Sequence, residues 1–176
     1  MLFLSWKAPS SSTACRLSPP PHPVVQEGGI GYNTIVEGPR VVLDTNILVA
    51  ALRSRRGASF QVVSEVGRDR FELVVSVPLV VEYEEALTKT RPPEVTEADI
   101  AVFLDYLCSQ ARLQEIFYLW RPHLRDPKDD LVLEAAVAGN CQAIVTHNQR
   151  HFGGAAAFGI QVLSPVEFLR LLGVVK

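Results

Sequence analysis

From Arg40 onward the chain alternates short apolar runs with longer amphipathic stretches, and this alternation restricts its fold more than any other feature. The apolar runs predict strands at 41–44, 71–76, 114–119, 142–146 and 160–163. The stretches between them predict helices at 47–52, 58–67, 78–89, 97–110, 127–139 and 165–172. Because strands and helices alternate, we expect an α/β fold: a three-layer α/β/α sandwich around a central, mainly parallel sheet of about five strands.

The first 38 residues differ in composition from the rest. They hold five of the twelve prolines and only four charged residues. Such a segment cannot bury enough apolar surface to fold, so we expect a disordered tail over 1–38 and a single folded domain over 39–176. A start codon assigned too far upstream would produce the same composition, and this alternative stays open.

Bulk composition excludes several classes of protein. The chain has 48% apolar residues and a net charge of −2, so it is no polycation that coats nucleic acid through charge alone. Cys15, Cys108 and Cys141 lie far apart without a CxxC pair, which argues against a zinc or redox site. Free thiols fit a reducing cytoplasm, and no apolar run approaches the roughly 20 residues that span a bilayer. We therefore expect a cytoplasmic protein without a membrane partner.

Two predicted helices begin with recognisable capping signals. Thr96 precedes the helix at 97–110, and Asp99 lies three residues later, as in a capping box. Ser164 and Glu167 repeat this spacing, with proline at the first helical position.

Asp44 is the first candidate for chemistry, because it stands where the apolar run 41–43 ends. Ligands of open α/β sheets bind beyond the carboxyl ends of the strands. Thr45 and Asn46 carry short polar side chains that could fix the rotamer of the carboxylate. The structural alternative is that Asp44 only caps the helix that follows it.

Glu82 is the second candidate. It follows the apolar residues 79–81, so we expect it to face inward, whereas Glu85 is expected to lie on a solvated helix face.

A run of acids opens the helix at 127–139. Asp126 before Pro127 is typical of an N-cap, and Asp129 lies where a first-turn acid suits the helix dipole. Helix structure thus accounts for both residues. Asp130 is left without such a role, so it is the stronger candidate for a ligand.

Asn148 follows the last-but-one predicted strand, where a carboxylate would complete a set of four. Its amide oxygen can still coordinate a cation or orient a water molecule. His147 and His151 lie beside it, and we expect solvent exposure rather than a role in the site for both. Carboxylates that converge from separate elements bind a hard divalent cation, for which a phosphodiester is the natural substrate.

The order and spacing of these residues resemble the PIN-domain family, in particular its VapC-like branch of toxins from toxin–antitoxin pairs. The resemblance extends over about residues 40–172 and includes the segment 158–169, which is similar to the last strand and helix of the family. It is carried by Asp44-Thr45-Asn46, a mid-chain Glu82, and Asp130 sixteen residues before Thr146.

This resemblance implies a ribonuclease that depends on Mg²⁺ or Mn²⁺ and hydrolyses RNA phosphodiesters with an activated water. It implies metal ligands at Asp44, Glu82 and Asp130, and a fourth site residue at Asn148. Thr45, Asn46 and Thr146 would support them. The implied partners are an RNA substrate, a small antitoxin protein and a second copy of the chain in a homodimer. Asn148 and His151 stand where similar sequences often carry aspartate, which leaves open whether one metal or two are bound.

The sequence also leaves room for two other functions. A phosphatase of the haloacid-dehalogenase type needs a second aspartate two positions after the first, and Asn46 occupies that position. A catalytically weak PIN-like module that binds RNA or protein would explain the missing fourth acid. The three remaining acids argue against it.

Overall fold

The computed structural model describes residues 38–117 and 123–175, and the predicted tail lies outside them except for Gly38. The strands are β1 (Arg40–Leu43), β2 (Glu72–Val75), β3 (Arg112–Leu113), β4 (Ala143–Val145) and β5 (Gln161–Leu163). The α-helices are α1 (Thr45–Arg53), α2 (Ala58–Ser64), α3 (Val77–Thr90), α4 (Glu97–Gln110), α5 (Pro127–Ala138) and α6 (Pro165–Leu171). Two short 3₁₀ helices, η1 (Gln149–Phe152) and η2 (Ala155–Phe158), follow β4 and were not predicted.

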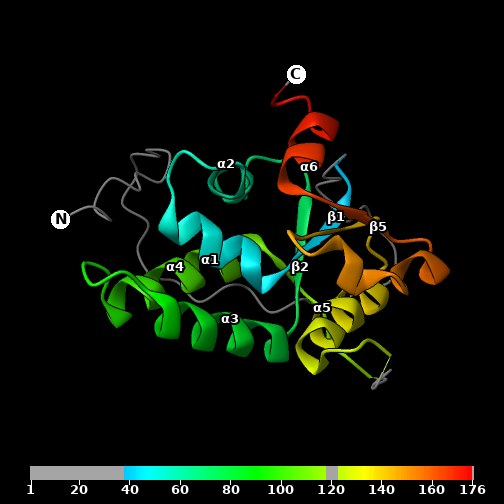
Figure 1. Ribbon diagram of the computed structural model, residues 1–176, viewed down its shortest axis with the longest axis horizontal. Helices are drawn as coiled ribbons and strands as arrows, with labels where there is room; N and C mark the ends of the chain where they lie inside the picture. The colour runs from blue at the N-terminus through cyan, green and yellow to red at the C-terminus, as the bar shows by residue number, and fades with distance from the viewer. Residues whose placement is uncertain (1–37, 118–122, 176) are drawn as a thin grey trace, which may run out of the picture. The chain divides into compact units, whose positions relative to one another are not determined.

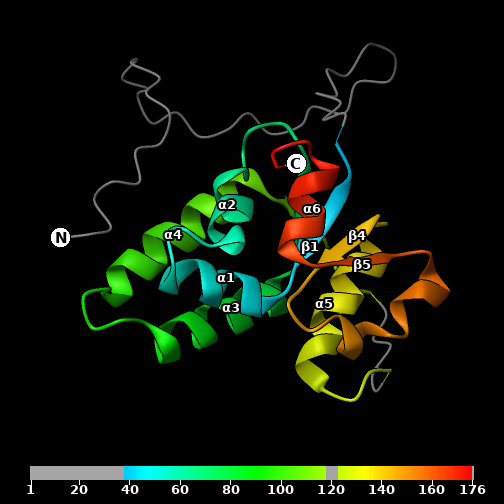
Figure 2. The same ribbon diagram turned by 45° about the horizontal axis from the view of Figure 1, so that its top comes forward.

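The described strands form one sheet in the order β3-β2-β1-β4-β5, and each neighbouring pair is parallel. Helix α5 packs against β1, β2 and β4, and it also contacts α3, which in turn contacts α4. Helix α2 contacts both α1 and α6. Figures 1 and 2 show α5 and α6 on opposite sides of the strands. The predicted α/β fold with a parallel central sheet is therefore confirmed.

The third strand differs from its predicted position. We expected it at 114–119, but it lies at Arg112–Leu113, and residues 114–117 are irregular. Its partner β2 ends at Val75, because the side chain of Ser76 accepts a hydrogen bond from the backbone of Leu79 and starts α3. The backbone N–H of Gln114 still reaches the carbonyl of Val75 at 2.8 Å. Beyond that point β2 offers nothing to pair with, and positions 118–119 lie outside the described residues.

The helix starts follow the sequence closely. Thr96 and Asp99 form a reciprocal capping box at α4, and Ser164 and Glu167 form another at α6, as predicted. Asp126 caps α5 by accepting a hydrogen bond from the backbone of Lys128. Within the ranges that the structure describes, no helix has both the length and the apolar character needed to cross a bilayer.

The order of the strands determines where a ligand can bind. The chain runs outward from β1 through β2 to β3, and then returns to the other side of β1 to form β4 and β5. The loops after β1 and β4 therefore leave the sheet in opposite directions and open a crevice at its carboxyl edge. Asp44 follows β1 and Thr146 follows β4, so both stand at this crevice.

Candidate active site

A cavity of about 270 Å³ lies at this edge of the sheet. Its lining combines carboxylates, amides and a hydroxyl from four segments of the chain. These residues are Asp44, Thr45, Asn46, Val49, Glu82, Asp126, Lys128, Asp129, Asn148 and His151. Three of the four residues predicted as catalytic, Asp44, Glu82 and Asn148, are among them. The fourth, Asp130, is not among them.

Asp44 is buried and held by its neighbours. Its Oδ2 accepts a hydrogen bond from Nδ2 of Asn46 at 2.6 Å and another from Oγ1 of Thr146 at 2.6 Å. Its Oδ1 accepts a longer bond of 3.4 Å from the backbone N–H of Asn46. Asp44 thus caps α1 and lines the cavity at once. The two interpretations offered by the sequence are therefore compatible.

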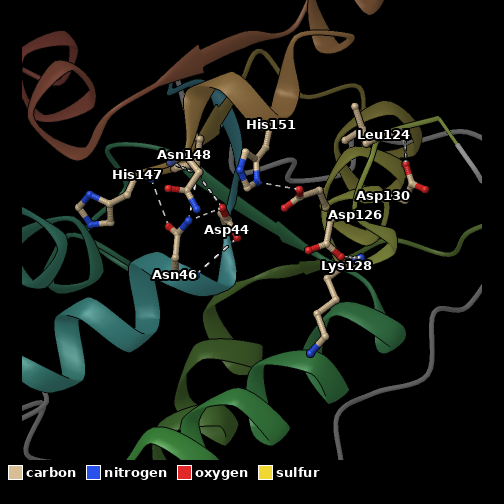
Figure 3. A network of polar contacts seen from close by, with 11 residues as sticks. Asp44, Asn46, Leu124, Asp126, Lys128, Asp130, His147, Asn148 and His151 are labelled. Atoms are coloured by element: carbon tan, nitrogen blue, oxygen red, sulfur yellow. Dashed lines mark hydrogen bonds and ion pairs between the residues drawn. The ribbon is translucent and has the colours of Figure 1, made fainter.

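The buried hydroxyl of Thr146 connects the polar residues after β1 with those after β4. It donates to Asp44, and it accepts from Nδ2 of Asn46 at 3.2 Å and from the backbone N–H of Asn148 at 2.9 Å. One donated and two accepted bonds use the full capacity of a hydroxyl. The amide oxygen of Asn46 in turn accepts the backbone N–H of His147 at 3.2 Å. Figure 3 shows Asn46, Asn148 and Asp44 grouped together.

Glu82 reaches the cavity from α3. Its side chain is buried, whereas Glu84 and Glu85 are exposed, as the sequence predicted for Glu82 and Glu85. The next residue, Tyr83, is fully buried and donates a short hydrogen bond from its hydroxyl to the carbonyl of Leu43. Because Leu43 precedes Asp44, this bond ties the helix that carries Glu82 to the strand that presents Asp44.

Helix α5 presents Asp129 to the cavity and turns Asp130 away from it. The carboxylate of Asp130 accepts the backbone N–H of Leu124 at 2.8 Å and that of His123 at 3.3 Å. Figure 3 places Asp130 beside Leu124, well apart from Asp44. The sequence favoured Asp130 for the site and a helix-capping role for Asp129, whereas in the structure Asp129 lines the cavity and Asp130 does not. Asp130 instead anchors the loop that leads into α5.

The difference arises from the rotation of α5 about its axis. The buried positions Val132, Leu133 and Ala136 follow Asp129 at three, four and seven residues, so they share a face of the helix with it. Since α5 is apolar on most of its circumference, the apolar pattern could not determine which of two adjacent acids shares the face toward the sheet.

His151 is exposed, as the sequence predicted, but contrary to expectation it also reaches the site. Its Nδ1 lies 3.1 Å from Oδ2 of Asp129, and its side chain lines the cavity. The unpredicted η1 helix turns the chain back after Asn148 and brings His151 over α5. The neighbouring His147 lies apart, with its Nε2 2.8 Å from Oγ of Ser59.

Two carboxylates of this site, those of Asp44 and Asp129, resist ionisation. Burial raises the pKa of Asp44 above 3.8, against the hydrogen bond from Thr146, and the charge of Asp129 raises it further. Burial likewise raises the pKa of Asp129, which the nearby His151 partly offsets. Both groups therefore stabilise the folded chain below about pH 3.8, and this contribution is lost as the pH rises through their raised pKa values.

This linkage leads to a test by thermal melting in EDTA. Asp44→Asn keeps a good helix cap and removes the charge. The melting temperature of the variant, measured relative to that of wild type, should therefore rise by a few degrees between about pH 4 and about pH 7. Glu85→Gln, which removes an exposed charge outside the cavity, should show no such gain. A difference between Asp44→Asn and wild type that stays constant over this range would contradict the electrostatic interpretation.

The donor set suits a hard divalent cation, since carboxylate and amide oxygens are its preferred ligands. In this conformation, no three His, Cys, Asp or Glu side chains of the described residues are gathered closely enough to hold an ion. Glu82 is instead paired with Lys128, whose Nζ lies 2.8 Å from Oε1. The ammonium of Lys128 thus already neutralises the carboxylate of Glu82.

The family model of the PIN domain matches residues 40–150 of this chain. The fold is similar to that in the structure of VapBC2 from Rickettsia felis bound to a DNA fragment from their promoter, with a TM-score of 0.52 and 17% identity over 71% of this chain and 98% of the other. It is also similar to VapBC-1 from nontypeable Haemophilus influenzae, with a TM-score of 0.50 and 17% identity over 72% and 98%. No curated protein matches the chain.

Proposed function

Because this chain belongs to the PIN-domain family, whose members are generally nucleases that use divalent metal ions, we propose that it is a ribonuclease dependent on Mg²⁺ or Mn²⁺. One observation carries the proposal. Asp44, Glu82 and Asp129, from three elements far apart in the sequence, line the same cavity at the carboxyl edge of the sheet. In this proposal Asp129, rather than Asp130, is the third acidic ligand.

Each side chain has a part in the proposed reaction. Asp44, held in one rotamer by Asn46 and Thr146, provides a fixed ligand. Glu82 and Asp129 provide the others, and the amide of Asn148 can orient the attacking water. A bound Mg²⁺ or Mn²⁺ would offset charge on the scissile phosphate and make that water more acidic. A carboxylate oxygen of the site would accept the proton of the water, and Asp129, which is bonded to His151, is placed for this role.

The proposal extends to the setting of the enzyme. The resemblance to the VapC-like branch supports a toxin role, with a small antitoxin protein as partner and a homodimer as the assembly. Light scattering on the purified chain measures the assembly, and co-purification with the product of an adjacent small gene tests the partner.

The activity itself is tested with purified full-length protein and RNA in Mg²⁺, in Mn²⁺ and in EDTA. We expect cleavage with either metal, none in EDTA, and a loss of about a hundredfold or more in Asp44→Asn. Glu85→Gln is the matched control, because Glu85 is exposed and outside the cavity, and it should retain activity. Cleavage that persists in EDTA, or that survives in Asp44→Asn, would contradict the proposal.

A further inference from the structure

Lys128 occupies an unusual place for a lysine. It stands in the first turn of α5, where the positive end of the helix dipole disfavours a cation. Lys128 lines the cavity, and its ammonium lies 2.8 Å from Oε1 of Glu82 on α3. Helix stability therefore gives no reason for a lysine at this position, whereas the ion pair with Glu82 does.

Glu82 and Lys128 differ in how freely their side chains can move. Glu82 is 8% exposed and lies on a helix that Tyr83 fixes to β1. The side chain of Lys128 is 58% exposed and is attached only through its flexible stem. In the part of the chain that the structure describes, it is the only lysine or arginine that lines the cavity. Of the two groups, the ammonium is thus the one that can leave.

A divalent cation and this ammonium cannot both bind Glu82 closely. Like charges in contact repel each other, and this repulsion is screened least where water is excluded. If Glu82 is a metal ligand, the ammonium must first move away. The ammonium can then stay near other acids. The hydrogen bond with Glu82 is the main cause of the raised pKa of Lys128, but the negative charges of Glu85 and Asp126 also raise it.

We propose that Lys128 is a built-in competitor of the metal, whose ammonium neutralises Glu82 until a divalent cation displaces it. This inference rests on the proposed function, since it takes Glu82 as a ligand. It implies that the site fills only at a higher concentration of metal than the same carboxylates would need without Lys128. It also implies that removal of the ammonium leaves Glu82 buried and unpaired in the metal-free protein.

The test is a calorimetric titration of the full-length protein with Mn²⁺, together with thermal melting in EDTA. Lys128→Met keeps an unbranched side chain only one atom shorter than that of lysine and removes the charge. It should bind Mn²⁺ about tenfold more tightly than wild type and melt at a lower temperature without metal. Lys128→Gln should change in the same direction. Lys128→Arg, which keeps the charge, should resemble the wild type.

Lys89→Met is the matched control, because Lys89 lies exposed in the last turn of α3, two turns beyond Glu82. It should leave Mn²⁺ affinity unchanged. Wild type and Lys128→Met with equal affinity would overturn the inference while the proposed metal site stands. An equal gain in Lys89→Met would also overturn it, since the effect would then be one of net charge. If no variant bound Mn²⁺, the proposed function and this inference would fall together.

Discussion

Asp129→Asn should lower metal-dependent RNA cleavage by about a hundredfold or more, because it removes a carboxylate from the cavity. Asp130→Asn should retain most of the activity and instead lose stability. Its carboxylate accepts two backbone N–H groups of the loop before α5, and the weaker neutral acceptor should cost about 1–3 kcal/mol of unfolding free energy.

Asp129→Asn and Asp130→Asn serve as controls for each other, since each replaces one buried aspartate of the same helix with its isosteric amide. Cleavage rates on RNA and urea unfolding curves, measured for both proteins, separate the two effects. A hundredfold loss of activity in Asp130→Asn at unchanged stability, with Asp129→Asn active, would restore the assignment that the sequence favoured.

Asn148→Asp should strengthen metal binding and weaken the metal-free fold. Asn148 lines the cavity with Asp44, and its backbone is bonded to Thr146, so a carboxylate here adds negative charge to groups that already resist ionisation. We expect the metal-free protein to lose about 1 kcal/mol, and affinity for Mn²⁺ to rise about tenfold. The stabilisation produced by saturating Mn²⁺ should grow accordingly.

Calorimetric titration and melting in EDTA measure both parts. Asn140→Asp is the control, because it makes the same change of charge at an exposed position outside the cavity. Its φ of 50° is one that aspartate tolerates as well as asparagine. If Asn148→Asp and Asn140→Asp behave alike, Asn148 has no part in the site.

The strands and helices were predictable because their causes are local. The helix at 97–110 was predicted with its observed limits, because Thr96 and Asp99 form its capping box and Ile100, Leu104 and Leu107 bury one face. The third strand was misplaced because its length depends on β2, which ends where Ser76 starts α3. A strand at the edge of a sheet has no such local signal, since its partner decides how far it extends.

The features of the site also divide into those with a local sequence signal and those without one. Asp44 was predictable because it ends an apolar strand, and the inward position of Glu82 was predictable because apolar residues precede it. The contact between His151 and Asp129 was not, since it needs the turn of η1 to bring together residues 22 positions apart.

By itself, therefore, the sequence determined the parallel α/β fold and the carboxyl edge at which acids collect. Strand propensity, caps and apolar periodicity are properties of neighbouring residues. Only the tertiary structure decided that α5 turns Asp129 toward the cavity and Asp130 toward Leu124, and that Lys128 pairs with Glu82. A helix that is apolar on most sides is rotated by the surfaces packed against it, and here those surfaces include β1, β2, β4 and α3.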